Sequence, residues 1–165
     1  MYLALEFSFP TGVEDCYSAL KWVYANANNL RIDANRITVV GDSAGGAPAA
    51  AVTQMARDRK HFPVCFQMLC YPVTDSRQIT KSVEMFIDTP IWNSPRNAMI
   101  WNVYLRNGDN GICFTNARKS FKNLPRVYVE VAEFDPLRDE GKNYADALKE
   151  NGIEVEFVQT NKNVL

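Results

Sequence analysis

A serine between two glycines is the feature of this sequence with the clearest chemical meaning. Ser43 follows a short β-branched run and precedes a run rich in alanine, with Gly41 and Gly45 two positions away on either side. A strand, a sharp turn and a helix in that order hold a serine in a strained conformation and expose its hydroxyl at the carboxyl edge of a sheet. We therefore interpret Ser43 as a candidate nucleophile, with the Ala44 N–H as a candidate oxyanion donor.

Residues 41–46 also fit a purely structural explanation. Glycines around a serine can simply form a tight strand-to-helix turn, and the short pattern occurs often by chance. The strand before it, the helix after it and a second acidic motif downstream favour the nucleophile. Asp42 is expected to stabilise this elbow rather than to react, and Gly46 completes the run of small residues.

A carboxylate follows a later apolar strand. Asp135 comes at the end of the strand predicted over 126–133, and Pro136 then turns the chain away. A carboxylate there could orient an imidazole and stabilise its cation. The alternative is that Asp135 caps the helix that follows it. Asp139 and Glu140 are interpreted as first-turn charges that the helix dipole favours.

The chain has a single histidine, His61. It falls between the helix after Ser43 and the next predicted strand, which is the amino-terminal edge of a parallel sheet. A strand of about eight residues at about 3.3 Å each separates that edge from Ser43, so we expect more than about 20 Å between them. His61 is therefore not expected to act as the base of Ser43.

Composition narrows the class of protein. The 165 residues are 47% apolar and 22% charged with a net charge of −1, which is typical of one globular domain and gives no sign of a nucleic-acid surface. No apolar run reaches the roughly 18 residues of a membrane span, and the first ten residues do not resemble a signal peptide. The four cysteines have no metal spacing and are interpreted as reduced core residues of a cytoplasmic protein; we expect no metal and no cofactor. They are Cys16, Cys65, Cys70 and Cys113.

Helical and strand patterns alternate along the chain, which predicts an α/β fold with a mostly parallel sheet. Strands are predicted over 37–41, 64–71, 126–133 and 153–158. Helices are predicted from Thr11, over 47–59, 98–105 and 138–151. Thr11 and Glu14 have the spacing of a capping box, and Pro48 predicts a kink or a late helix start. A core over 1–73 and 125–165 would carry a cap-like insertion over 74–124, within one domain.

Several motifs together resemble the hormone-sensitive-lipase-like branch of the α/β-hydrolases, a family of esterases and lipases. They run nearly from end to end of the chain. The matching segments are 2–6 with Phe9-Pro10, 13–16, 19–22, the elbow at 41–46, 70–73 and 132–141. The resemblance implies a partial α/β-hydrolase fold and carboxylic-ester hydrolysis, with Ser43 forming the acyl intermediate and Asp135 as the acid of the triad.

The resemblance also implies an acyl pocket, and it implies two catalytic parts of the family that this sequence does not contain. In the family the insertion covers an acyl pocket, which Trp92, Trp101 and Tyr104 would line; ordinary core packing explains these aromatics equally well. The family's His-Gly-Gly-Gly loop and triad histidine would fall before and after this sequence. We therefore expect a piece of a longer esterase with little activity by itself.

Three further expectations follow. The partner is a small-molecule ester, and the open strand edge at 37–41 invites association with a second copy. A non-catalytic remnant that serves as an interaction module is the alternative function, and a serine peptidase of the same superfamily is a weaker one. The insertion and the motif at 135–141 favour the esterase over the peptidase.

Overall fold

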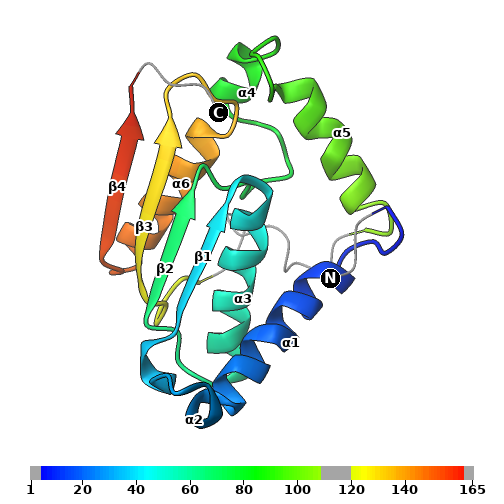
Figure 1. The fold of residues 1–165 in the computed structure, drawn as a ribbon. Helices are drawn as coiled ribbons and strands as arrows, with labels where there is room; N and C mark the ends of the chain where they lie inside the picture. The colour runs from blue at the N-terminus through cyan, green and yellow to red at the C-terminus, as the bar shows by residue number, and fades with distance from the viewer. Residues whose placement is uncertain (1–4, 109–119, 162–165) are drawn as a thin grey trace.

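Four parallel strands form the sheet that carries the candidate residues (Figure 1). The computed structural model describes residues 5–108 and 120–161. The strands are β1 (Thr38–Asp42), β2 (Phe66–Cys70), β3 (Arg126–Ala132) and β4 (Val155–Thr160). The helices are α1 (Thr11–Ala25), α2 (Ala27–Leu30), α3 (Gly46–Arg59), α4 (Lys81–Met85), α5 (Ser94–Tyr104) and α6 (Arg138–Glu150), with short 3-10 turns η1 (Ala34–Arg36) and η2 (Ser43–Gly45).

The sheet has the order β1-β2-β3-β4, and every neighbouring pair is parallel. This confirms the predicted fold class, and each predicted strand lies within about two residues of the observed one. Parallel neighbours require crossovers, which α3 supplies between β1 and β2 and α6 between β3 and β4. The longer crossover between β2 and β3 contains α4 and α5.

Helices α3 and α6 cover the same face of the sheet, behind the strands in Figure 1. Alternate strand residues such as Leu69, Val127 and Val129 pack there against Ala50 of α3 and Tyr144 of α6, and all are at most 1% exposed. Helix α1 packs on α3 rather than on the strands, through Val13 and Tyr17 among others. The opposite face of the sheet carries no helix of the described residues.

Three local expectations were wrong. Helix α1 begins at Thr11 itself, with Pro10 as the N-cap and no side-chain cap, so Thr11 and Glu14 form no capping box. Pro48 does not delay the start of α3, which begins two residues earlier at Gly46. Pro48 lies in the first turn of the helix, where backbone N–H groups need no helical acceptor. The helix predicted over 98–105 begins earlier, at Ser94, because Pro95 lies in its first turn, where proline is tolerated, and the N-cap Asn93 accepts a hydrogen bond from Arg96 N at 3.1 Å.

The cysteines agree only partly with the expectation of reduced core residues. Cys16, Cys65 and Cys70 are free thiols. Cys16 and Cys70 are half-buried, but Cys65 is exposed, because β2 begins one residue later than Cys65. Cys113 lies outside the described residues. Among the helices that the structure describes, none has the length and apolar content needed to cross a bilayer.

Candidate active site

Ser43 has a backbone conformation that few residues adopt. It follows β1 directly and begins the turn η2, with a φ of 48° in the left-handed region. A residue with a side chain pays a conformational penalty there, and the surrounding structure must hold it in place. The Ser43 carbonyl accepts a hydrogen bond from Val73 N at 3.1 Å, which ties the turn to the segment after β2.

The two glycines beside Ser43 are not equally constrained. A Cβ at Gly41 would come within 2.3 Å of Gly45 O and 2.7 Å of the Ala49 Cβ, so no side chain fits there. A Cβ at Gly45 would meet only Asp42 Oδ1, at 3.8 Å, which is ordinary contact. The turn therefore depends on glycine at position 41, and the sequence pattern alone does not separate the two positions.

The rest of the elbow is arranged around close backbone packing. A Cβ at Gly46 would lie 2.5 Å from the Pro72 Cβ, so α3 can approach the end of β2 only with glycine there. Asp42 is exposed, and its side chain does not cap η2. Ala44 is exposed at the surface of the turn.

Asp135 is fully buried between β3 and α6. Its Oδ1 accepts a hydrogen bond from Leu137 N at 2.8 Å, while its Oδ2 has no hydrogen-bond partner among the described residues. Burial raises the pKa of this carboxyl to about 6, although the Leu137 N–H and the charge of Arg138 act in the opposite direction. The N-cap of α6 is Leu137, so Asp135 orders the turn before the helix rather than capping it.

Ser43 and Asp135 follow strands of the same sheet. Ser43 comes one residue after β1 and Asp135 comes three residues after β3. The register aligns Asp42 with Cys70 and Cys70 with Glu130, so these strands end side by side. Both candidates therefore lie at the carboxyl edge, where open α/β sheets bind their ligands.

His61 lies at the opposite, amino-terminal edge. It follows α3 and precedes β2, and it is exposed. Its Nδ1 is 2.6 Å from the Tyr17 hydroxyl, and its ring lies beside Tyr17 and Phe62. This contact gives the imidazole a structural role on α1, far along the strands from Ser43.

The aromatics proposed for an acyl pocket pack tightly. Trp101 is 6% exposed within the core cluster that contains Phe9, and Tyr104 stacks edge-on against Phe9 with ring centres 5.5 Å apart. Trp92 is half-buried against the same cluster. The indole N–H groups of Trp92 and Trp101 are buried without a hydrogen-bond partner among the described residues. Core packing accounts for most of the Trp101 surface.

A buried glutamate beside Asp135 was not predicted. Glu140 is 1% exposed, and its Oε1 accepts hydrogen bonds from Thr74 N at 2.6 Å and Asp75 N at 3.3 Å. Burial raises its pKa well above the usual range, and the charges of Asp75 and Asp135 act in the same direction. The sequence does carry a signal for this: Glu140, Tyr144 and Leu148 recur every fourth residue, which is the inward stripe of α6.

Asp139 and Ser82 extend this connection to α4. Asp139 Oδ2 accepts from Ser82 N at 2.8 Å, and the Ser82 hydroxyl donates to Pro136 O at 2.8 Å. We call Ser82, Asp139 and Glu140 the insertion clamp, because they fasten residues 74–82 to the start of α6. The clamp places the insertion beside Asp135.

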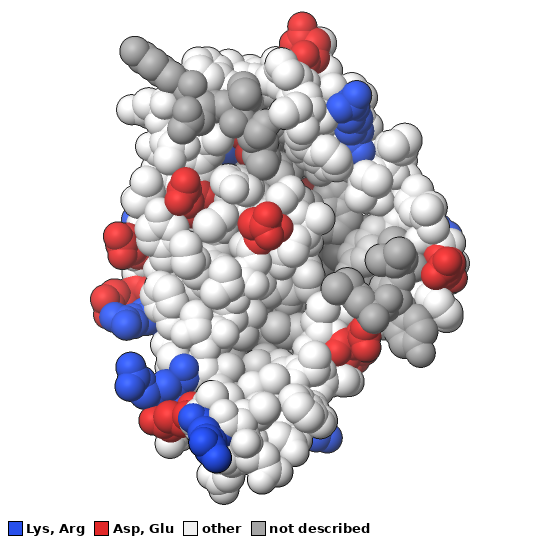
Figure 2. All heavy atoms as spheres, in the orientation of Figure 1, with Lys and Arg blue, Asp and Glu red and all other residues white. Residues whose placement is uncertain are grey.

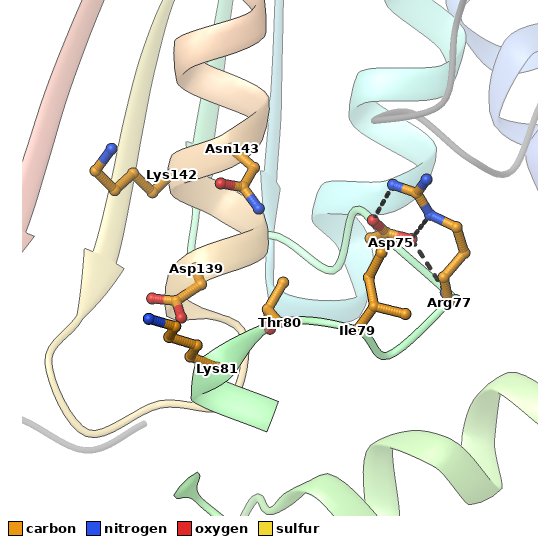
Figure 3. Close-up of a pocket in the computed structure, with 8 residues that line it drawn as sticks. All are labelled: Asp75, Arg77, Ile79, Thr80, Lys81, Asp139, Lys142 and Asn143. Atoms are coloured by element: carbon orange, nitrogen blue, oxygen red, sulfur yellow. Dashed lines mark hydrogen bonds and ion pairs between the residues drawn. The ribbon is translucent and has the colours of Figure 1, made fainter. Parts of the chain in front are cut away.

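A hollow of about 370 Å³ lies on the outer side of the insertion clamp (Figure 3). Neither Ser43 nor Asp135 lines it. Its charged side chains are largely paired, as in the contact of Arg77 with Asp75 at 2.5 Å. The lining residues are Asp75, Arg77, Ile79, Thr80, Lys81, Asp139, Lys142 and Asn143. In the part of the chain that the structure describes, no three His, Cys, Asp or Glu side chains are grouped to hold a metal ion.

The strained elbow, the buried carboxylate and the parallel sheet together define a class of protein. A family model described as the alpha/beta hydrolase fold matches residues 2–164. The chain belongs to this family, which confirms the resemblance that its motifs indicated.

Several curated proteins that this chain resembles are esterases. Esterase LipI of Mycobacterium tuberculosis is 36% identical over 159 residues, which cover 93% of this chain and 49% of LipI. Carboxylesterase NlhH of the same species is 38% identical over 161 residues, covering 94% of this chain and 50% of NlhH. The chain thus spans about half the length of the curated relatives it matches.

Solved structures give the same picture. The crystal structure of esterase LipW from Mycobacterium marinum superposes with a TM-score of 0.91 at 34% identity, over 96% of this chain and 50% of that one. At such similarity the shared fold extends through nearly all of the chain.

Proposed function

We propose that Ser43 and Asp135 are the nucleophile and the orienting acid of a carboxylic-ester hydrolase. The observation that carries the proposal is the elbow: Ser43 holds a φ of 48° at the end of β1, and Gly41 leaves no room for a Cβ. The esterase names of LipI and NlhH support the same class of substrate.

In this reaction Ser43 Oγ attacks the carbonyl carbon of an ester, and its proton passes to a base. The tetrahedral oxyanion forms beside the N–H of Ala44, the alcohol leaves with a proton, and water then releases the acid from the acyl-serine. Asp135 supports this chemistry by accepting an N–H from the base and stabilising its cation. Its buried Oδ2 is the atom available for that hydrogen bond.

The base is the part that His61 does not supply, because its Nδ1 contacts Tyr17 at the opposite edge of the sheet. A serine without a base is a weak nucleophile. This supports the alternative that the chain as it stands serves as a non-catalytic module. The two functions differ in one respect: only the hydrolase site gains activity when a base is added.

Added imidazole tests this directly. We expect imidazole to raise the hydrolysis of p-nitrophenyl butyrate by the chain, after subtraction of the rate with Ser43→Ala, because its basic nitrogen accepts the Ser43 proton. N-methylimidazole, which is basic but has no N–H, tests the part of Asp135: a smaller gain with it than with imidazole would mean that Asp135, fully buried at rest, becomes reachable and accepts that N–H. Equal rates for the chain and Ser43→Ala under all conditions would favour the non-catalytic module.

A further inference from the structure

The face of the sheet opposite α3 and α6 has an apolar central row, and no helix of residues 5–108 and 120–161 covers it. Val40 on β1 is 62% exposed, and Phe66, Met68 and Tyr128 are half-buried on the same face, as the alternation of strand residues requires. Parallel sheets are normally covered on both faces, because their crossover connections place helices there and the side chains of both faces are largely apolar. Figure 2 views this face: uncharged surface covers its middle, and acidic groups lie toward the carboxyl ends of the strands.

The residues of this face form three rows across the strands. The central row is Val40, Met68 and Tyr128, which the register places side by side. The row on the amino-terminal side, two residues earlier on each strand, is Thr38, Phe66 and Arg126. Two residues toward the carboxyl edge, it is Asp42, Cys70 and Glu130.

The charges of these rows are arranged for self-association. On β3, Arg126 and Glu130 lie two residues before and two residues after Tyr128. A two-fold axis parallel to the face and running along the central row exchanges the amino and carboxyl edges. It therefore lays Arg126 of one copy over Glu130 of the other, twice per dimer, while the central row meets itself.

We propose that a second copy of this chain covers the open face, in a symmetric sheet-on-sheet dimer whose axis follows the row Val40, Met68 and Tyr128. Such a contact is isologous, so one surface serves both copies. Packed sheets lie about 10 Å apart with their strands within about 30° of one another, which suits side chains of this size. The charge pattern, positive at the amino edge and negative at the carboxyl edge, selects the antiparallel arrangement.

Two neighbouring groups fit this arrangement. Glu130 Oε2 already accepts a hydrogen bond from the Tyr128 hydroxyl at 2.8 Å, which holds the carboxylate over the face. The Arg126 guanidinium lies 5.2 Å from the Phe66 ring centre, which orients it toward the same face. Glu156 on β4 extends the central row and is exposed, so the same axis brings the two copies of this like charge toward each other and opposes contact at β4.

Sedimentation velocity between about 1 and 100 µM tests the dimer, because mass action shifts the equilibrium over that range. We expect a species of twice the 18.7 kDa chain mass. Val40→Lys should give a monomer, since it buries a charge at the centre of the contact but leaves the backbone edge of β1 intact. Ile87→Lys is the matched control: Ile87 is 60% exposed but lies in the insertion, and its replacement should change nothing.

Charge exchange makes the test specific for the proposed axis. Arg126→Glu and Glu130→Arg should each weaken association at least about tenfold, because like charges then face each other. The double variant should recover it, since opposite charges meet again. A chain that stays monomeric at every concentration would overturn the proposal. So would a Val40→Lys variant that still dimerises, which would point to the edge of β1, or a double variant no better than the single ones.

Discussion

At the scale of single residues, the elbow rests on Gly41 more than on Gly45. We expect Gly41→Ala to lower the free energy of unfolding by about 3 kcal/mol or more, because its Cβ would lie 2.3 Å from Gly45 O. Gly45→Ala should change it by less than about 1 kcal/mol, since its Cβ meets only ordinary contact and alanine narrows the unfolded ensemble. Urea unfolding of the matched pair measures both values, and equal losses would contradict the described elbow.

Asp135 should make stability depend on pH. Its pKa is about 6 when folded and lies near the ordinary 3.8 when unfolded, so the folded state holds the proton more tightly. Asp135 therefore contributes most to the free energy of unfolding below pH 3.8. This contribution, up to about 3 kcal/mol, is lost as the pH rises to about 6. Between pH 4.5 and 8 the chain should lose more stability than Asp135→Asn does. The exposed Glu150→Gln serves as control, and an unchanged pH profile in Asp135→Asn would contradict the burial of this carboxyl.

Single residues also mark where sequence reasoning succeeds. The positions of Ser43 and Asp135 at the carboxyl edge of the sheet could be predicted, because each follows an apolar strand; their chemical roles stay a prediction. Glu140 was interpreted only as a first-turn charge that the helix dipole favours, and it does lie in the first turn of α6, but its burial was not predicted. Its burial depends on the approach of Thr74 and Asp75 from a distant segment, which no local pattern encodes.

At the scale of elements, the insertion clamp joins the segment after β2 to the start of α6. Glu140→Ala removes the acceptor shared by Thr74 N and Asp75 N and leaves a cavity, so we expect a loss of about 2–4 kcal/mol in the free energy of unfolding. Glu140→Gln keeps an acceptor of the same shape and should lose less. Thermal unfolding followed by circular dichroism measures both. A Glu140→Ala loss no larger than that of Glu150→Ala would show that the clamp does not hold the insertion.

The strands were predictable because apolar and β-branched runs separated by turn residues leave few alternatives. The first residues of the helices were harder to predict. Pro95 and Pro48 both lie in first turns, where proline is tolerated, and only the position of the preceding residues distinguishes this from a break. The short helix α4 was missed, because five residues give too few turns for a periodic pattern.

At the scale of the whole molecule, the sheet has one helical layer on one face. Order β1-β2-β3-β4 with crossovers of one hand places α3 and α6 on the same side, and the opposite face stays apolar and open in the described residues. The topology follows from the alternation of strands and helices. The open face does not, because periodicity says which residues share a face but not what covers it.

The same topology brings Ser43 and Asp135, the proposed nucleophile and acid, to one edge of the sheet and leaves His61 at the other. This arrangement is the central claim, and labelling by a fluorophosphonate probe tests it most directly. With imidazole present, intact-protein and peptide mass spectrometry should find the adduct on Ser43 ahead of every other serine. Ser43→Ala should abolish the adduct and Asp135→Ala should slow its formation. An adduct spread over other serines, or none on Ser43 with the base supplied, would contradict the account.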